Sequence, residues 1–465
     1  MHLPPVLNIY NLENGNSMMV IKDGLVFIKE AGDFVKTDIK IKQGRIVDIK
    51  PNIPAEGKIL PAGNLQIFPG MIDPHVHLND PGFNQRETFL TGTSAAAAGG
   101  VTTIVDMPCT SNPVIINLAN LNIKLKQVAD RAVVDYGFFG GVSGKSYSPR
   151  TEKDIGELAS RVLGIKTYFH SSDKNYTRVN HYQFQHILAI CKSYKKPVLL
   201  HAEDHDFVKH AQKTMMDKGN RPEDYYLSRP ETAELLAVQN AIALNRNVQA
   251  NLHIVHLATG EASDLIQHNP ATGETAAHYL AFDLGDFISQ GASLKVAPCI
   301  KPSKNKKHLW KNLQAGIIDY IASDHAPCPP TSKQSESVWE QYSGIPGLET
   351  SLLFLYSEGL LKKRISLSRF VEVTSSAAAH KFGLEKQKGG ISVGRHADLV
   401  LIDPNKTTVV KGTDFFSKGK ITPFEGWKFK GKIINTVVRG EIVFDHLKGI
   451  CVDPGYGKYV GGGRN

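Results

Sequence analysis

The 465-residue chain has few cysteines and no long apolar run, and each of these shortages excludes a class of protein. Its five cysteines are odd in number, far apart and without a C-x-x-C pair, so a disulfide framework or a zinc ribbon is not expected and a reducing compartment fits best. No segment approaches the roughly 20 apolar residues that cross a bilayer. The start, MHLPPVLNIYNLENG, lacks the basic and then apolar regions of a signal peptide. We therefore expect a cytoplasmic protein with no membrane segment.

The chain also lacks a dense basic patch, although its formal net charge is +9. Lys and Arg are scattered, and the densest cluster, KPSKNKK at 301–307, contains no aromatic residue that would stack on a base. We interpret the charge as a solvated basic surface and expect no nucleic-acid partner. Hydrophobic residues make up 41% and charged residues 21%, which fits a folded globular protein rather than a disordered one.

What the sequence does contain is a change of pattern along its length. Residues 17–51 and 396–445 show near-alternating apolar and polar residues with Gly turns, which is typical of strands. Between them, short apolar runs that end in polar residues alternate with helical stretches, for example 116–131, 151–161 and 230–244. This is the pattern of βα units around a parallel sheet.

Eight such runs predict an α/β fold, in which a (β/α)8 TIM-like barrel carries a small β-sandwich domain built from both termini. The expected parts are 1–66 for the N-terminal portion of the small domain, 67–385 for the barrel, and 386–465 for the C-terminal portion and tail. The eight runs, each expected to form one barrel strand, are 65–78, 100–108, 133–142, 162–170, 196–204, 251–258, 293–298 and 318–327.

Potential metal ligands occur at the ends of these runs. In MIDPHVHLNDPG (71–82), His75, His77 and Asn79 are spaced by two and would share one face of a strand. Four more candidates lie in later runs: Lys166, His201, His256 and Asp324.

The C-terminal ends of barrel strands meet at one mouth, so these side chains would converge there. Several histidines with a carboxylate form a nitrogen and oxygen ligand set suited to Zn²⁺ or a similar divalent ion. Each residue alone has an ordinary explanation: a histidine satisfied by the backbone, or a lysine that extends to water. Their joint occurrence at five strand ends favours a metal site.

The same residues fall in motifs that resemble the cyclic amidohydrolases of the amidohydrolase superfamily, which include dihydroorotase, allantoinase and hydantoinase. The motifs cover nearly the whole chain and occur in the order typical of the family. They are PGMIDPHVHL (69–78), TGTSAAAAGGVTTIVDMP (91–108), GIKTYF (164–169), LLHAED (199–204), SRPETAE (228–234), LHIVHLA (252–258), ETAAHYL (274–280), IASDHAP (321–327), GIPGLET (344–350) and GRHADLVLID (394–403).

The resemblance implies a binuclear metal centre. It implies two divalent ions, with zinc the expected metal, held by His75, His77, Lys166, His201, His256 and Asp324. Lys166 would be carboxylated by CO₂, and the resulting carbamate would bridge the two ions. A metal-activated hydroxide would attack a ring carbonyl, and Asp324 would accept its proton and return it to the leaving nitrogen, as catalytic base and then acid.

Four expected substrate-binding positions depart from the dihydroorotase pattern. Asn79 replaces an Arg that pairs with the substrate carboxylate, and Cys109 and Ala297 each stand where an Asn is usual. Cys328 replaces a His. All four changes remove groups that read a carboxylate, and three of them resemble allantoinase, whose substrate has none.

Two functions therefore remain open. Whole-chain resemblance, including TPFEG (422–426), favours a dihydroorotase-type enzyme of pyrimidine biosynthesis, which interconverts dihydroorotate and N-carbamoyl-aspartate. The pocket favours an allantoinase or a hydantoinase-like hydrolase of a neutral cyclic ureide. Lys301 or Arg86 would be a replacement cation for a carboxylate, although each is more simply a solvated surface charge.

A non-catalytic relative would have lost at least one metal ligand, and none is missing, so we expect an enzyme. The resemblance further implies a small cyclic amide as substrate and a homo-oligomer, either a dimer or a tetramer. His278 in ETAAHYL has no assigned chemistry and is interpreted as structural. The polar stretch 327–344 is expected to form a mobile rim of the site, or else a surface loop that does not contact substrate.

Overall fold

The structure of the protein is a computed structural model that describes residues 18–461. The segment on which the signal-peptide prediction rests, residues 1–15, lies outside this range, as do residues 462–465 of the tail. Among the described residues, no helix combines the length and the apolarity needed to cross a membrane.

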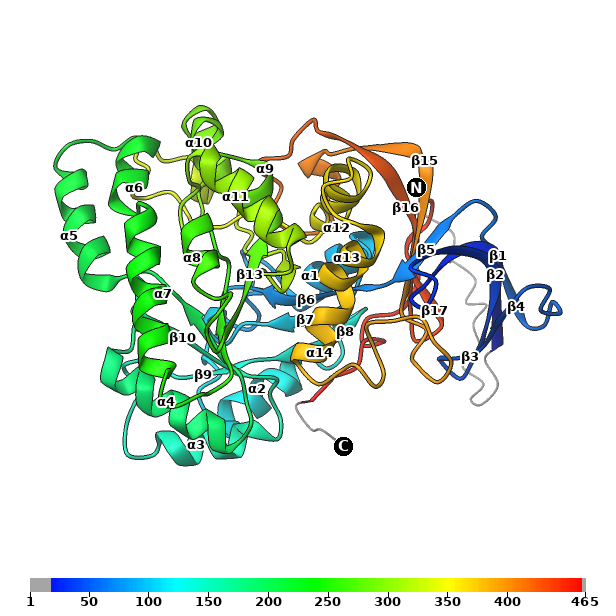
Figure 1. Cartoon of the computed structure of the whole chain (residues 1–465), viewed down its shortest axis with the longest axis horizontal. Helices are drawn as coiled ribbons and strands as arrows, with labels where there is room; N and C mark the ends of the chain where they lie inside the picture. The colour runs from blue at the N-terminus through cyan, green and yellow to red at the C-terminus, as the bar shows by residue number, and fades with distance from the viewer. Residues whose placement is uncertain (1–17, 462–465) are drawn as a thin grey trace, which may run out of the picture.

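A mixed sheet joins the two ends of the described chain. In Figure 1 the blue strands from the N-terminal part lie beside the orange and red strands from the C-terminal part. The sheet has the order β18-β17-β16-β15-β5-β1-β2-β3, with β4 paired to β1. Its strands are β1 (Met18–Ile28), β2 (Asp33–Lys42), β3 (Arg45–Lys50), β4 (Lys58–Pro61), β5 (Gln66–Pro69), β15 (Leu399–Val409), β16 (Lys428–Val438), β17 (Glu441–Asp445) and β18 (Gly449–Ile450).

The middle of the chain forms the predicted barrel. Consecutive strands pair in parallel, and a bridge between Val76 and His325 joins the last strand position to the first. Strands β8 and β9, separated by Phe139, share one position: β8 pairs with β7 and β9 with β10. The barrel strands are β6 (Met71–Val76), β7 (Val101–Asp106), β8 (Asp135–Phe138), β9 (Gly140–Gly141), β10 (Ile165–Tyr168), β11 (Val198–His201), β12 (Leu252–Ile254), β13 (Ala271–Ala276) and β14 (Tyr320–Ala322).

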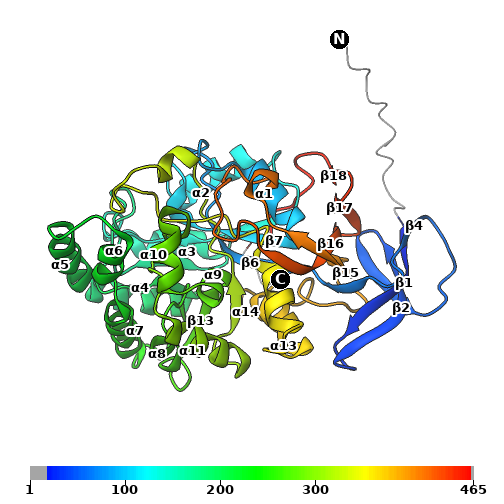
Figure 2. The ribbon, with the colours of Figure 1, turned by 90° about the horizontal axis from the view of Figure 1, so that it is seen from above.

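Helices surround the barrel strands and lie outside them in both views (Figures 1 and 2). The three helices predicted from the sequence are confirmed as α2, α3 and α7. The helices are α1 (Phe89–Ala98), α2 (Leu118–Val128), α3 (Thr151–Ala159), α4 (His181–Ser193), α5 (His205–Met216), α6 (Pro222–Ser228), α7 (Glu231–Asn245), α8 (Gly260–Asp264), α9 (Ala277–Ala281), α10 (Leu284–Gln290), α11 (Ser303–Gln314), α12 (Ser351–Phe354), α13 (Leu367–Val371) and α14 (Ala377–Lys381).

The predicted seventh strand is wrong. Residues 293–298 lie in a 3₁₀ turn and the coil that follows it, and the seventh barrel position belongs to β13, which pairs with both β12 and β14. Strand β13 has the sequence ATGETA, without a large apolar residue, so the hydrophobic pattern does not reveal it. Its buried Glu274 is compensated by hydrogen bonds from histidines of other strands, which only the folded barrel brings close.

The first predicted run is divided between the two parts of the molecule. Strand β5 pairs with β1 and β15 in the terminal sheet, and β6 begins the barrel after Gly70. A Cβ at position 70 would lie 2.1 Å from Cγ2 of Thr102, so only glycine permits this close crossing. The expected boundary between residues 66 and 67 therefore falls inside β5; the domain limits themselves stay a prediction.

Aromatic packing fastens the sheet to the barrel. Phe68 of β5 contacts Phe370 of α13 edge-on, with ring centroids 5.1 Å apart, and Phe34 of β2 at 5.2 Å. Edge-to-face pairs of this kind add to the hydrophobic stabilisation of the buried area. The two parts share one continuous core, which holds the barrel strands that carry the candidate ligands.

Candidate metal centre and active site

The candidate ligands lie at the C-terminal ends of the barrel strands. His75 lies near the end of β6 and His77 directly after it, Lys166 lies within β10, and His201 is the last residue of β11. Two more residues follow their strands at a distance of two: His256 after β12 and Asp324 after β14. This end of a parallel barrel is where catalytic groups converge.

The backbone at two of these ends is unusual. His256 has φ of 43° and Asp324 has φ of 47°, both in the left-handed region that non-glycine residues rarely adopt. Such a conformation turns the side chain away from the direction the strand would give it. Strained positions of this kind concentrate at functional sites, where the surrounding structure enforces them.

His75, His77 and Asp324 form the first half of the site. One carboxylate oxygen, Oδ1 of Asp324, lies 3.3 Å from Nε2 of His75 and 3.3 Å from Nε2 of His77. The potential ligand atoms of the three residues all lie within 4.8 Å of one another. Two imidazoles and a carboxylate that face one point make a set suited to a divalent metal ion.

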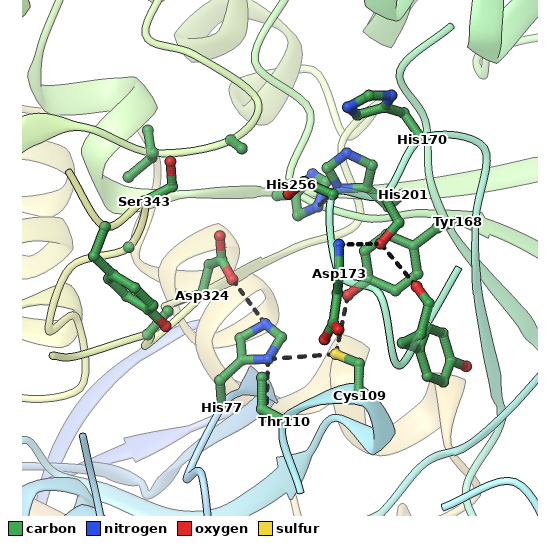
Figure 3. A pocket seen from close by; sticks show the side chains of 18 of the residues that line it. His77, Cys109, Thr110, Tyr168, His170, Asp173, His201, His256, Asp324 and Ser343 are labelled. Carbon is green, nitrogen blue, oxygen red and sulfur yellow. Dashed lines mark hydrogen bonds and ion pairs between the residues drawn. The ribbon is translucent and has the colours of Figure 1, made fainter. Parts of the chain in front are cut away.

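His201 and His256 form the second half. Nδ1 of His201 lies 2.9 Å from Nε2 of His256, and the centroids of the His256 and His75 rings are 5.3 Å apart. Figure 3 shows His201 and His256 facing each other, with Asp324 and His77 on another side of the same space. The five candidate ligands, from four strands, therefore surround one small region.

Lys166 completes this region. Its amine is fully buried, has no hydrogen-bond partner, and lies 5.0 Å from the centroid of the Tyr168 ring. Burial lowers the pKa of Lys166 to about 8. The Tyr168 ring stacks on the ring of His201, with centroids 5.1 Å apart, so the Lys166 amine lies beside the second half of the site. The positive charge of Lys166 contributes to lower pKa values of His75, His201 and His256.

The protonation states of the histidines suit metal binding. Burial lowers the pKa of His75, His201 and His256, so these rings are neutral and offer a lone pair. Burial also disfavours the charged form of His77, but hydrogen bonds to Asp324 and Cys109 outweigh it and raise the pKa of His77 to about 10. A metal ion would take the place of the proton that His77 shares with Asp324.

The residues present therefore fit the metal centre that the family resemblance implies. Two buried nitrogens, Nζ of Lys166 and Nδ1 of His256, have no hydrogen-bond partner among residues 18–461, which costs free energy unless a ligand satisfies them. The donor set is rich in imidazole with one carboxylate, as divalent zinc and related ions prefer.

Two buried glutamates hold the histidines from behind, and the sequence reasoning did not assign them a role. Glu274 accepts a hydrogen bond from Nδ1 of His75, and Nε2 of His253 lies 3.2 Å from its other oxygen. Glu203 accepts from Nε2 of His201 at 2.9 Å and from Arg229. Carboxylates behind ligating histidines fix the ring orientation and raise its basicity.

The signal for these supporting residues was present in the motifs. Glu203 lies in LLHAED, Arg229 in SRPETAE and Glu274 in ETAAHYL. Each motif places a charged residue next to a candidate ligand or among apolar residues, and a charge that is buried in such a place requires a partner. The spacing of residues along the sequence does not show which residue of another strand is that partner.

His75, His77, His201, His256 and Asp324 line a cavity of about 620 Å³, a size typical of small-molecule sites. Its walls come from the segment after β6, the segment 168–176 at the end of β10, the coil 295–297 and the loop 339–344. The predicted rim 327–344 thus contributes lining residues from its C-terminal half. Lys295 and Lys333 donate hydrogen bonds between this loop and the segment 292–295.

Two of the predicted substrate-binding residues line this cavity. Ala297 is one, and Cys109 is the other. The Cys109 thiol lies 3.1 Å from Oη of Tyr168 and 3.8 Å from Nδ1 of His77, and Figure 3 shows it beside His77. Their contact with substrate stays a prediction.

Asn79 does not lie where strand alternation placed it. Strand β6 ends at Val76, and Asn79 has φ of 60°, so its side chain does not share the face of His75 and His77. The side chain is fully buried, and its amide donates to the carbonyl of His77 at 2.8 Å. Asn79 is not among the residues that line the cavity, and this placement supports the loop behind His77 rather than a substrate contact.

Cys328, Lys301 and Arg86 differ in their burial and in whether they line the cavity. Cys328 is buried and lies outside the cavity lining, and burial raises the pKa of its thiol. Lys301 is buried and donates to the carbonyl of Arg229, so it is not the solvated surface charge that the sequence favoured. Arg86 is half-buried and lines the cavity.

His278 lies next to the site without being one of its ligands. It is buried in α9, its Nε2 has no hydrogen-bond partner, and burial lowers its pKa to about 4. Its ring packs on Tyr279, with centroids 4.2 Å apart. The interpretation of His278 as structural stays a prediction.

Comparison with known proteins now places the chain among its relatives. The sequence profile of the Amidohydrolase family matches residues 66–443. The chain belongs to the amidohydrolase family. The match begins in β5 and ends in β17, so it spans the barrel and part of the terminal sheet.

The relatives of this amidohydrolase include two bacterial allantoinases. The allantoinase of Solibacter usitatus is 32% identical over 438 residues, which cover 92% of this chain and 94% of that protein. The allantoinase of Enterococcus faecalis is 32% identical over 448 residues, which cover 93% of this chain and 97% of that protein.

Solved structures of the same fold include hydantoinases. The L-hydantoinase (dihydropyrimidinase) of Arthrobacter aurescens aligns with a TM-score of 0.90 and 29% identity, covering 95% of this chain and 99% of that chain. The dihydropyrimidinase of Brevibacillus agri NCHU1002 aligns with a TM-score of 0.88 and 29% identity, covering 95% and 98%. The predicted barrel with a separate sheet domain is thereby confirmed.

The family, its relatives and the ligand set identify this chain as a metal-dependent cyclic amidohydrolase with a small-molecule substrate. The expected enzyme class is confirmed. The dihydroorotase-type specificity, favoured above on whole-chain resemblance, is not shown, and these relatives agree better with the alternative.

Proposed function

We propose that this enzyme opens the ring of a cyclic ureide of the allantoin or hydantoin type by hydrolysis. The observation that carries the proposal is the convergence of His75, His77, His201, His256 and Asp324 on one cavity. The fully buried amine of Lys166 lies behind its Tyr168 wall. The carboxylate reader expected of a dihydroorotase is lacking at position 79, where a buried Asn stabilises a loop instead. The allantoinase and hydantoinase relatives support the same choice.

We assign the five converging residues and Lys166 to two divalent ions, with zinc the preferred metal. Two ions bound there would lower the pKa of a bound water and polarise the scissile carbonyl. His75, His77 and Asp324 would hold one ion, and His201 and His256 the other. Glu274 and Glu203 keep the rings of His75 and His201 oriented for this task.

Lys166 would serve as an anionic bridge between the ions. As an ammonium it would repel them, but its neutral amine can attack CO₂ and release a proton, which yields a carbamate with two ligand oxygens. The lowered pKa of Lys166, about 8, makes the neutral amine accessible near neutral pH. Its buried amine, without a hydrogen-bond partner, supports this role.

Asp324 would move the proton. Burial favours the neutral acid, but the neighbouring His75 and His77 hold the pKa of Asp324 well below its usual range, so the carboxylate is ionised at neutral pH. Its Oδ1 faces the two histidines, and Oδ2 remains to accept the proton of the attacking water. The same oxygen would return that proton to the amide nitrogen as it leaves, because an amide anion is too basic to depart unaided.

Further properties follow from the family resemblance and are proposed on that basis. We expect a homo-oligomer, either a dimer or a tetramer, in the cytoplasm. Light scattering of the purified protein would test the assembly, and metal analysis of the purified protein would test the preference for zinc.

The first experiment measures ring opening of allantoin, hydantoin, dihydrouracil and dihydroorotate by protein loaded with zinc in bicarbonate buffer. We expect turnover of allantoin or hydantoin, and loss of that turnover in D324N and after chelation. Turnover of dihydroorotate alone would contradict the proposal and restore the dihydroorotase-type function. Absence of turnover with the whole panel would contradict both.

A further inference from the structure

Arg86 is a cation in the wall of the substrate cavity. It lies between β6 and α1, is half-buried, and lines the cavity together with Phe83 and Tyr342. Its guanidinium carbon lies 4.9 Å from the centroid of the Phe83 ring and 4.9 Å from that of Tyr342. Two aromatic rings therefore fix the position of the charge at the cavity wall.

The Arg86 guanidinium has no partner among residues 18–461. No carboxylate of this part of the chain lies within 4.0 Å of it, and none of the hydrogen bonds in the described structure uses its side-chain nitrogens. Only its backbone N–H is engaged, with the carbonyl of Phe83 at 2.8 Å. A guanidinium removed in part from water carries five N–H donors that favour an acceptor.

Three other buried cations around the cavity are satisfied by the protein, and the unpartnered Lys166 is already assigned to the metal centre. Arg229 pairs with Glu203, Lys295 donates to the carbonyls of Val338 and Gln341, and Lys301 donates to the carbonyl of Arg229. Arg86 differs from these three. Its N–H donors remain open to water or to an acceptor on a molecule in the cavity.

Arg86 is linked to the catalytic floor through Tyr342. Burial raises the pKa of the Tyr342 phenol to about 12, with the Arg86 charge opposing and the Asp324 charge reinforcing this shift. The charges of Arg86 and Asp324 therefore both act on the Tyr342 phenol. A ring held over Asp324 could direct a substituent along Tyr342 toward Arg86.

We propose that Arg86 forms an anion-binding subsite that reads a carboxylate on the exocyclic substituent of the ring. The inference rests on the proposed cyclic ureide hydrolysis and narrows its substrate class. A planar guanidinium and a carboxylate form two parallel hydrogen bonds, which a neutral substituent does not match in strength. The substrate would then be a cyclic ureide of the hydantoin type whose side arm ends in a carboxylate, unlike dihydroorotate, whose carboxylate is attached directly to the ring.

The decisive comparison uses two substrates of equal size, hydantoin-5-acetate and its primary amide. The wild-type enzyme should have the higher kcat/KM for the acid. In R86Q this preference should fall by about 10- to 100-fold, the range expected for a lost charged hydrogen bond. R86K keeps the charge without the planar fork and should retain part of the preference.

Arg178 provides a matched control. It is half-buried and lines a separate surface hollow with Phe169 and His205, outside the catalytic cavity. R178Q removes the same charge and should leave the ratio of the two substrates unchanged. A ratio that falls equally in R178Q and R86Q would reflect net charge alone and would overturn the subsite.

Binding measured by calorimetry tests the anion-binding subsite independently of the proposed ring-opening reaction. Hydantoin-5-acetate should bind wild-type protein at least about tenfold more tightly than R86Q, while its amide should bind both alike. This binding difference without turnover would contradict the proposed reaction and support the subsite. Turnover with equal acid-to-amide ratios in both proteins would support the reaction and overturn the subsite.

The carboxylate released by ring opening is the other possible source of the anion. Inhibition by the ring-opened product of plain hydantoin tests this source. If R86Q weakens that inhibition and leaves the acid-to-amide ratio unchanged, the substituent-reading role is overturned.

Discussion

Nδ1 of His75 hydrogen-bonds to Glu274, a carboxylate 199 residues further along the chain. Glu274 lies on β13, and His253 of β12 and the phenol of Tyr320 on β14 complete the buried network around it. Burial would favour the neutral acid, but His75 and His253 hold the pKa of Glu274 below its usual range. The ring of His75, a candidate metal ligand, is therefore oriented by β13, a strand that carries no candidate ligand.

This pairing predicts the effect of a conservative change. E274Q keeps the shape but removes the negative charge behind His75, so metal occupancy and activity should each fall by about 10- to 100-fold. Metal content per chain, measured by mass spectrometry after dialysis, checks the first effect. E358Q is the control, because Glu358 pairs with Lys362 outside the candidate metal centre and the cavity lining. Full metal content in E274Q would rule out this role of Glu274.

Lys166 offers a spectroscopic prediction. Protein loaded with zinc in ¹³C-bicarbonate should show a carbamate carbon resonance that is missing from K166A. K166A should also lose activity by at least about 100-fold, because removing a bridging ligand exceeds the effect of removing an outer partner. A wild-type spectrum without the resonance would show that Lys166 binds as a plain amine or does not bind.

The buried amine of Lys295, which donates hydrogen bonds to the predicted rim 327–344, should make the stability of the protein depend on pH. Burial lowers the pKa of Lys295 from 10.5 to about 7 in the folded state, so the unfolded chain binds more protons between these values. Stability relative to K295M should therefore rise with pH from about 7 to 10.5, by up to about 5 kcal/mol. Denaturant titrations of both proteins across this range measure the difference. K218M, at an exposed lysine, should show no such trend relative to wild type.

A substitution at Asn79 tests whether this residue stabilises the loop after β6 or contacts the substrate. Because its amide donates to the His77 carbonyl and its side chain is fully buried, N79A should lower the free energy of unfolding by about 1–2 kcal/mol. The ratio of kcat/KM between allantoin and hydantoin should stay within about twofold of wild type. A larger change in that ratio at unaltered stability would show that Asn79 contacts the substrate.

Much of the site could be predicted from the sequence because its ligands are local to strand ends. An apolar run followed by His or Asp marks a buried strand and its C-terminal end, and His201, His256 and Asp324 were found in this way. The rule failed at β13, whose polar sequence ATGETA has no apolar run. It also failed at Asn79, because alternation holds only while the strand continues, and β6 ends at Val76.

By itself, the sequence determined the barrel, the terminal strands that flank it, and the identity of the candidate metal ligands, because each depends on patterns within a few residues. Only the tertiary structure decided the partners: Glu274 behind His75, Glu203 and Arg229 behind His201, and Arg86 between two aromatic rings without an acceptor. The physical reason is burial. A charged side chain removed from water requires a specific neighbour, and the fold brings that neighbour from a distant part of the chain.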